Sequence, residues 1–149
     1  KTTFANYELI ASENDRVFNY ENRIYRPFMT DQLLLKQLMT ILFDNAIKYT
    51  EEDGEIEFVV YATDRHLYLT VTDNGIGISD ADKKKIFDRF YRVDKARTRQ
   101  KGGFGLGLSL AKQIVDALRG TISVKDNKPR GTIFEVKVAI QSPSKRKNK

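Results

Sequence analysis

Apolar residues recur at helical spacing in three stretches of the chain, and each stretch is predicted to form a helix. The longest begins after Asp31, a suitable N-cap, and has apolar residues at positions 34, 35, 38, 41, 42, 46 and 49. The second is predicted over residues 81–90, because Ser79-Asp80-Ala81-Asp82 resembles a capping box. The third is predicted over residues 106–118 and ends at Gly120.

Elsewhere apolar and polar residues alternate, which predicts strands. The predicted strands are 17–20, 24–27, 55–63, 66–73, 121–125 and 132–140. The first two flank a polar turn at 21–23, and the other four pair as two hairpins. These blocks favour an α/β fold, a two-layer sandwich in which one mixed, largely antiparallel sheet is covered on one face by about three helices.

The composition fits a single domain and excludes several kinds of site. The chain has 149 residues, of which 40% are apolar, enough for a sizeable core. The absence of cysteine excludes disulfides, thiolate metal sites and thiol nucleophiles, and a single histidine excludes a multi-histidine metal site. That residue, His66, begins a predicted strand and is interpreted as a surface or hairpin residue. No apolar run approaches the ~18–20 residues that span a membrane, and the first residue, Lys1, suggests a fragment of a longer protein.

The net charge of +6 is concentrated in two segments. Residues 141–149 contribute +4 and are predicted to be a disordered basic tail, whereas residues 83–101 contribute +7. Residues 92–103 within the second segment show no periodicity and are predicted to be a long mobile loop. A compact polyanion such as a nucleoside triphosphate fits this distribution better than a nucleic-acid duplex does, and a solvated surface helix is the alternative.

Two segments carry side chains suited to such a ligand. In the first helix, Asn45 lies one turn before Lys48, and an amide oxygen beside an ammonium group suits a magnesium–phosphate pair. The alternative is that both are ordinary surface residues. In Asp73-Asn74-Gly75-Ile76-Gly77, a carboxylate can accept from a donor such as an exocyclic amine, and the glycines allow a flat ligand to approach the backbone. Here the alternative is a tight hairpin turn, of which Asn-Gly is typical.

A glycine-rich segment, 102–108, leads into the last predicted helix, where backbone N–H groups suit an anion. It does not match a Walker A loop, which requires lysine where Leu108 stands. It does not match the dinucleotide-binding pattern either, which requires glycine at the same position. Phosphates bound here are therefore held by a different architecture.

In this order the segments resemble the motifs of sensor histidine kinases. Residues 44–50 (Asp-Asn-Ala-Ile-Lys-Tyr-Thr) resemble the N box, 73–77 the G1 box, 86–92 (Ile-Phe-Asp-Arg-Phe-Tyr-Arg) the F box and 103–108 (Gly-Phe-Gly-Leu-Gly-Leu) the G2 box. Arg130-Gly131-Thr132 resembles a small closing element, and the matches extend over residues 31–140. The resemblance implies the ATP-binding sandwich shared by gyrase, heat-shock-90 chaperones, histidine kinases and mismatch-repair ATPases.

The resemblance also implies the cofactors, ATP and Mg²⁺, and the residues that contact them. Asn45 would bind Mg²⁺ and Lys48 would contact phosphate, and these two are the candidate catalytic residues. Tyr49 would line the nucleotide pocket, and Asp73 would accept a hydrogen bond from the adenine amino group. The other residues implied to contact the nucleotide are Gly75, Gly77, Arg92, Gly103, Gly105, Leu106, Gly107, Leu108 and Thr132.

The same resemblance implies an organisation and a location. Residues 1–16 would be a remnant of the linker from dimerisation helices, 17–140 the catalytic domain with its ATP lid at about 89–103, and 141–149 a basic tail. The domain would transfer the γ-phosphoryl group of ATP to a histidine on a separate dimerisation domain, with a downstream response regulator as a further partner and no nucleic acid. It would be the cytoplasmic domain of a membrane-bound bacterial sensor. His66 does not match the phosphoacceptor pattern of that family.

One position departs from the family. Ile41 stands where many members have asparagine and the hydrolysing relatives have a glutamate base. Because isoleucine cannot orient or deprotonate water, efficient ATP hydrolysis is disfavoured, and one contact to Mg²⁺ is lost or replaced by water. An ATPase, a protein-serine kinase or an ATP-binding pseudokinase on the same fold stay as alternatives, together with a nucleic-acid-binding module from another class.

Overall fold

The computed structural model describes residues 2–24, 30–88 and 107–141. The helices and strands, in chain order, are α1 (Thr2–Glu13), β1 (Val17–Arg23), α2 (Gln32–Tyr49), β2 (Glu55–Ala62), β3 (His66–Asp73), α3 (Asp80–Lys83), α5 (Gly107–Ala117), β4 (Thr121–Asp126) and β5 (Thr132–Ala139). The predicted lid and tail, as well as part of the predicted strand 24–27, lie outside the described residues.

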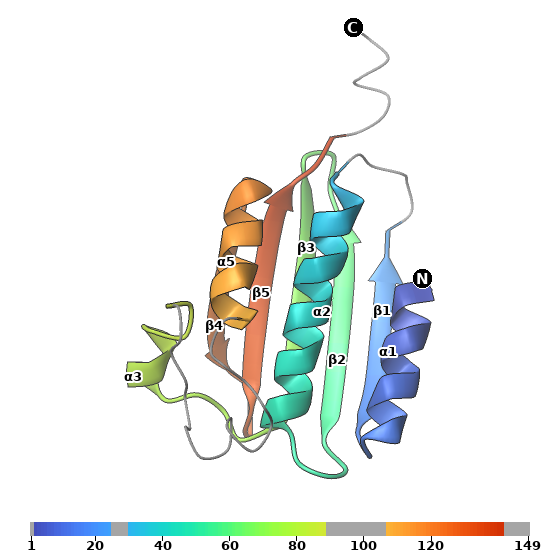
Figure 1. The fold of residues 1–149 in the computed structure, drawn as a ribbon, viewed down its shortest axis with the longest axis vertical. Coiled ribbons are helices and arrows are strands. Elements are labelled where there is room, and N and C mark those ends of the chain that lie inside the picture. The colour runs from blue at the N-terminus through green and yellow to red at the C-terminus, as the bar shows by residue number, and fades with distance from the viewer. Residues whose placement is uncertain (1, 25–29, 89–106, 142–149) are drawn as a thin grey trace, which may run out of the picture.

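The five strands form one sheet in the order β1-β2-β3-β5-β4. Strand β1 runs parallel to β2, and the other neighbouring pairs are antiparallel. Helices α1, α2 and α5 lie side by side on one face of this sheet (Figure 1). The predicted two-layer α/β sandwich with a mixed, largely antiparallel sheet is confirmed.

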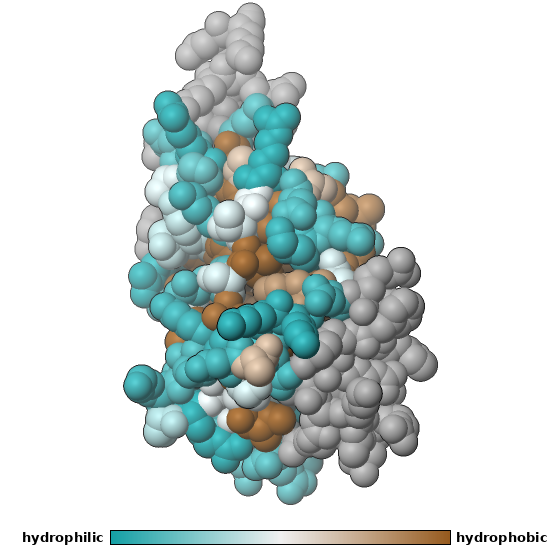
Figure 2. Space-filling model, turned by 90° about the vertical axis from the view of Figure 1, so that its left-hand side faces the viewer, coloured by the Kyte–Doolittle hydropathy of each residue, from teal (hydrophilic) through white to brown (hydrophobic). Residues whose placement is uncertain are grey.

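The core lies between the sheet and the three helices because every second strand residue points to the helical layer. In β3 the alternate residues Leu67, Leu69, Val71 and Asp73 are buried, and the residues between them are half-buried. The helices contribute the buried side chains Tyr7, Ala11, Leu38, Leu42, Phe43, Ala46, Ala111, Ile114 and Val115. From the side of α3, α5 and β4, hydrophobic residues appear as small separate patches among hydrophilic ones (Figure 2).

Helix α1 packs into this core, although it falls in the segment predicted as a linker remnant. The ring of Tyr7 stacks on Phe43 of α2 with centroids 4.4 Å apart, and the Tyr7 hydroxyl shares a hydrogen bond of 2.8 Å with Thr40. Phe18 of β1 meets Tyr7 edge-on. Residues 2–13 therefore contribute to the same domain as the sheet.

Two helix starts agree with the predicted caps. The side chain of Asp31 accepts from the N–H of Leu34 at the start of α2, and that of Ser79 accepts from the N–H of Asp82 at the start of α3. Helix α3, however, is a single turn that buries no residue, whereas a helix over 81–90 was expected. Its cap and two ion pairs of Lys83, to Asp80 and Asp126, hold this turn. Residues 84–88 continue as turns and a bend, although Ile86 is buried in the core.

The polar turn predicted at 21–23 is wrong. These residues continue β1 and pair with residues 59–61 of β2. Strand β1 is at the edge of the sheet, so its polar side chains reach solvent while the backbone completes the parallel pairing. Tertiary pairing therefore overrides the local turn signal.

The end of α5 also differs from the expected glycine cap. The residue in the left-handed conformation is Arg119, with φ of 59°, and not Gly120. Gly120 is required for another reason, since a Cβ there would lie 2.0 Å from the carbonyl oxygen of Lys137 in β5. Glycine at 120 thus lets the chain leave α5 directly against the sheet.

This arrangement predicts opposite effects at two adjacent positions. Arg119→Gly is expected to raise the free energy of unfolding by about 1 kcal/mol, because it relieves a left-handed side-chain-bearing residue. Gly120→Ala is expected to lower it by about 1–3 kcal/mol, because the added methyl collides with backbone. Urea denaturation followed by circular dichroism measures both, and the opposite order of stabilities would refute this account of the helix end.

Candidate functional site

Three segments far apart in the sequence meet at one end of the sheet: the end of α2, the loop after β3 and the turn before β5 (Figure 1). The N–H of Ile76 donates to the carbonyl of Tyr49 over 2.9 Å. A Cβ on Gly75 would lie 1.9 Å from the same carbonyl oxygen, so only glycine fits there. The loop after β3 is therefore seated directly on the last turn of α2.

The turn between β4 and β5 holds this loop from the other side. Arg130 donates from Nε to the carbonyl of Gly75 over 2.7 Å, and Asn127 donates from Nδ2 to the carbonyl of Asp73 over 2.9 Å. Gly131, with φ of 111°, comes so close that a Cβ would lie 1.9 Å from the Asp73 carbonyl oxygen. Two backbone contacts that exclude side chains thus fix the loop between α2 and β5.

Asp73 is the ionisable side chain that this arrangement buries, with 2% of its surface exposed. Its Oδ1 accepts a hydrogen bond of 2.8 Å from the N–H of Gly75. Burial raises the pKa of Asp73 to about 6, against the opposing effect of hydrogen bonds from the backbone N–H groups of Gly75 and Thr132. Within residues 2–24, 30–88 and 107–141 no cation contributes to this pKa, so the carboxyl is suited to gain a hydrogen-bond donor from a ligand.

Two further side chains have a buried polar atom without a hydrogen-bond partner among the described residues, namely Nδ2 of Asn45 and Oγ1 of Thr132. Thr132 lies opposite Asp73 in the register of β3 and β5. Asn45 lies one turn before Tyr49 on α2. Because buried polar atoms in folded proteins are nearly always paired, these two atoms are candidates to bond a polar group of a ligand or a water molecule.

The first turn of α5 lies beside the same part of α2. A Cβ on Gly107 would contact Cγ2 of Ile41 at 3.6 Å, and Ile41 lies one turn before Asn45. The first N–H groups of an 11-residue helix such as α5 have no partner within the helix, and its positive end attracts anions. Lys48, half-buried near the end of α2, adds a positive charge three residues after Asn45 and interacts with the Asp44 carboxyl on the same helix.

The described part of the predicted site is therefore assembled from both layers. The predicted residues that the structure describes are Asn45, Lys48, Tyr49, Asp73, Gly75, Gly77, Gly107, Leu108 and Thr132. Arg92, Gly103, Gly105 and Leu106 lie outside the described residues. The contacts above connect four of these residues, namely Tyr49, Asp73, Gly75 and Thr132. Gly107 lies next to Ile41 of α2.

Two residues that hold the loop escape prediction from sequence. Asn127 and Arg130 bind carbonyl groups 54 and 55 residues away, and no local pattern marks such long-range hydrogen bonds. For Arg130 the resemblance of residues 130–132 to a family element is the one available signal. For Asn127 the sequence gives none.

The comparison with protein families settles the identity of this domain. The family of histidine kinase-, DNA gyrase B- and HSP90-like ATPases matches this chain over residues 30–142. The matched range is most of the chain and includes all three segments of the site. The chain belongs to this ATPase family. The resemblance to sensor histidine kinases is confirmed by the relatives below.

Individual relatives of this ATPase domain are sensor proteins. Sensor protein CiaH of Streptococcus pneumoniae serotype 4 is 82% identical over 146 residues, which are 98% of this chain and 33% of that protein. The chain thus spans about a third of the length of the CiaH proteins. The mycobacterial sensor histidine kinase MprB has a TM-score of 0.75 at 26% identity, covering 95% of this chain and 93% of that one.

A third neighbour shows the same fold. Histidine kinase ThkA, in complex with response regulator protein TrrA, has a TM-score of 0.73 at 24% identity, over 97% of this chain and 40% of that one. In the described part of this ATPase domain, no helix has both the length and the apolar character needed to cross a membrane. Nor does that part hold a group of three His, Cys, Asp or Glu side chains that could bind a metal ion by themselves.

The burial of Asp73 predicts an unusual dependence of stability on pH. The pKa of Asp73 is about 6 in the folded domain against 3.8 for an ordinary aspartate, so the folded state binds the proton more tightly. The free energy of unfolding should therefore fall as the pH rises from about 4 to about 6, by up to roughly 3 kcal/mol from this residue.

Urea denaturation of the wild type and Asp73→Asn at several pH values isolates this effect. The wild type should lose stability relative to the variant across the window, because asparagine does not titrate. Asp64→Asn, an exposed aspartate in the β2–β3 turn, is the matched control. Parallel pH profiles for the wild type and Asp73→Asn would rule out the raised pKa.

Proposed function

We propose that this domain binds Mg·ATP and transfers its γ-phosphoryl group to a histidine on a separate dimerisation domain, as part of a two-component sensor. The membership in the ATPase family and the similarity to CiaH and MprB support this proposal. The observation that carries it is the buried carboxyl of Asp73 beside Gly75, at the point where α2, β3 and β5 meet.

Asp73 is proposed to recognise the base of the nucleotide. A buried carboxylate without a cation partner accepts strongly from an exocyclic amine, since a donor on the ligand replaces the lost hydration. Gly75 packs on the carbonyl of Tyr49, and Gly77, with φ of 79°, lies beside Gly131. A flat base is proposed to lie against the loop that these two glycines shape. Thr132 adds an unpaired hydroxyl next to the carboxyl.

Asn45 and Lys48 are proposed to face the phosphates. Nδ2 of Asn45 is buried without a hydrogen-bond partner among the described residues, so it could donate to a polar ligand. The amide oxygen of Asn45 is a suitable ligand for a hard cation such as Mg²⁺. When bound, Mg²⁺ would neutralise charge on the triphosphate. Lys48 would add a positive charge, and the start of α5 at Gly107 and Leu108 would offer backbone N–H groups to the phosphates. Arg92, Gly103, Gly105 and Leu106, outside the described residues, would complete the phosphate contacts, and Tyr49 would line the pocket.

The position of Ile41 favours transfer over hydrolysis. It is half-buried, lies one turn before Asn45 and would contact a Cβ on Gly107 at 3.6 Å. An apolar side chain at this point of the helix cannot activate water. With no general base there, the residues around the nucleotide act by positioning and by neutralising charge, which suffices for phosphoryl transfer to an incoming imidazole.

The partners and location are also part of the proposal. ThkA, a structural neighbour, forms a complex with a response regulator, and we propose a response regulator as the downstream partner here too. The phosphoacceptor histidine would belong to the dimerisation domain of the same receptor. His66 is half-buried at the start of β3 and has no role in this scheme. The domain would work in the cytoplasm, as part of a membrane-anchored bacterial sensor.

Nucleotide binding by the 149-residue chain tests the base contact. We expect ATP or ADP to bind in the presence of Mg²⁺ in the micromolar to millimolar range, and Asp73→Asn to weaken binding at least about tenfold, ~1.4 kcal/mol. Isothermal titration calorimetry measures both, with Asp64→Asn as the charge-matched control at the other end of β3. Equal affinity of the wild type and Asp73→Asn would remove the assigned base contact.

The ATPase alternative makes a different prediction about the free domain. With Ile41 in place of a general base, Mg·ATP incubated with the chain alone should release no more ADP than a blank, even when nucleotide binding is saturated. Phosphate should leave ATP only when a histidine-bearing dimerisation domain is added, and it should appear on that domain. Steady ADP production without an acceptor, measured by a coupled assay, would favour an ATPase.

A further inference from the structure

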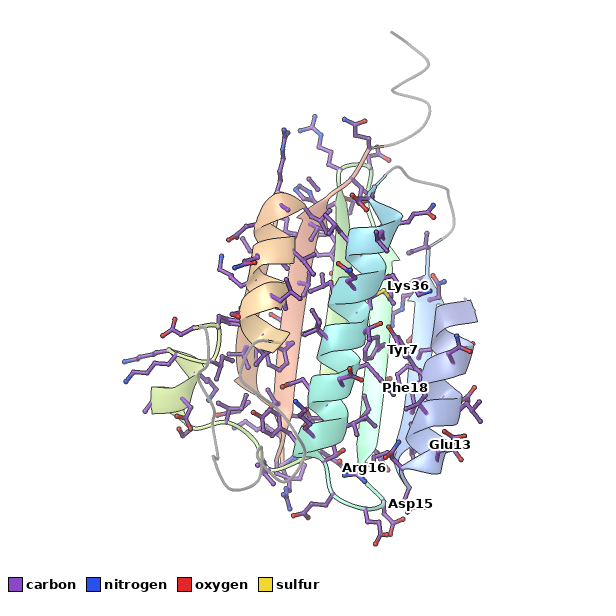
Figure 3. The ribbon with its side chains drawn as sticks, viewed as in Figure 1. Tyr7, Glu13, Asp15, Arg16, Phe18 and Lys36 are labelled. Atoms are coloured by element: carbon purple, nitrogen blue, oxygen red, sulfur yellow. The ribbon has the colours of Figure 1, made fainter. Side chains whose placement is uncertain are left out.

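Arg16, in the short turn between α1 and β1, is half-buried, and its guanidinium donates four hydrogen bonds. Its guanidinium donates to the carbonyl of Ile47 over 3.2 Å, and to the carbonyl and hydroxyl of Thr50 over 2.5 and 3.1 Å. A fourth bond, to the carbonyl of Asn14 over 2.6 Å, fixes the turn itself. Figure 3 shows Arg16 beside the end of α2, next to Asp15.

These bonds hold the end of the helix that carries Asn45, Lys48 and Tyr49. The last carbonyl groups of a helix have no partner within it, and a cation near them also interacts favourably with the negative end of the helix dipole. Thr50, which is fully buried, ends α2 with its hydroxyl donating to the carbonyl of Ala46 over 2.9 Å. Arg16 thus binds both the last turn of α2 and the residue that terminates it.

The backbone around Arg16 joins the same region. The carbonyl of Asp15 accepts from the N–H of Asp53 over 2.7 Å, and the N–H of Val17 donates to the carbonyl of Gly54 over 2.8 Å. The turn between α1 and β1 is therefore bonded to the turn between α2 and β2 on both sides of Arg16.

From that turn the contacts continue into the candidate site. The N–H of Glu55 donates to Oδ1 of Asn74 over 2.8 Å, and the carbonyl of Glu55 accepts from the N–H of Asn74. On the other side the carbonyl of Tyr49, within the turn of α2 that Arg16 caps, accepts from the N–H of Ile76. The residues on both sides of Gly75 are thus supported by the segments that Arg16 fastens.

We propose that Arg16 is a positioning residue for nucleotide binding, which holds the last turn of α2 in register with the Asp73–Gly77 loop. Its four hydrogen bonds reach none of the candidate site side chains that the structure describes, and Arg16 acts through Tyr49, Thr50 and the turn at 51–54. The inference rests on the proposed function, because its effect is measured on the nucleotide site. The fork of a guanidinium suits this role, since it reaches two carbonyls and a hydroxyl at once, whereas lysine offers one point charge.

The test compares Arg16→Gln, Arg16→Lys and the control Arg65→Gln in the 149-residue chain. Arg65 is exposed in the β2–β3 turn at the opposite end of the sheet, so its replacement removes the same charge. Calorimetry with ADP and Mg²⁺ should give a dissociation constant raised about tenfold in Arg16→Gln and about threefold in Arg16→Lys, with no change in the control.

A second readout separates positioning from general stabilisation. Hydrogen exchange of the Ile76 amide, followed by NMR in the folded protein, should be about tenfold faster in Arg16→Gln, because its acceptor on Tyr49 is no longer held. Amides in the core of β3 exchange through global unfolding, so their protection should change only as much as the free energy of unfolding does. A residue that merely stabilises the fold would lower the melting temperature and leave both the affinity of the folded protein and this local protection unchanged.

The outcomes are distinct. Wild-type affinity in either folded Arg16 variant would overturn the inference, and if Arg16→Gln does not fold, the lysine variant decides. A wild-type chain that binds no nucleotide would instead overturn the proposed function, and the exchange of the Ile76 amide would then still report on whether Arg16 positions the loop.

Discussion

The close contact between the end of α2 and the loop after β3 constrains the rest of the structure. The carbonyl of Tyr49 accepts from the N–H of Ile76, and the approach at Gly75 leaves no room for a side chain. Such a contact forms only if the helix and the strand stop at fixed positions. The helix is held in place by the buried Leu38, Leu42 and Phe43, so the hydrophobic core sets the geometry of the loop. Helix α2 therefore contributes both to the core, through these side chains, and to the site, through the carbonyl of Tyr49.

The position of Asp73 follows from the same alternation that builds the core, and it opposes stability. Leu67, Leu69 and Val71 face the helical layer, and the period of two brings Asp73 to that side as the fourth member. A hydrophobic residue there would continue the core, whereas the carboxyl is desolvated and has its pKa raised to about 6. The backbone N–H groups of Gly75 and Thr132 offset part of this cost. Ionisable groups whose pKa is shifted by burial are concentrated at functional sites, and the burial of Asp73 supports its proposed role in binding a ligand.

The sequence predicts the elements whose signal is local and fails where the decisive contact is distant. Helix α2 with its cap at Asp31 and the strand that ends at Asp73 follow from periodicity and capping alone. The strand through residues 21–23 does not, because its pairing with β2 outweighs a polar turn signal. Arg16 and Asn127 leave no trace in the pattern, since the groups they bind lie 31–34 and 54 residues away. Local patterns therefore predict the elements that carry the candidate site residues better than the distant contacts that hold those elements together.

The side chain of Ile41 takes part in the packing of α2 against α5, and it also bears on whether the phosphoryl group of ATP is transferred to water or to a histidine. The start of α5 lies close to α2 at this residue, since a Cβ on Gly107 would be in van der Waals contact with the Ile41 side chain at 3.6 Å. An apolar residue here packs the two helices together, and it leaves no polar group of α2 one turn before Asn45 that could orient a water molecule. Under the proposed function, a phosphoryl group held between Asn45 and the first turn of α5 would therefore persist until an imidazole arrives. Under this proposal the same apolar side chain that packs against the start of α5 also disfavours water as the acceptor.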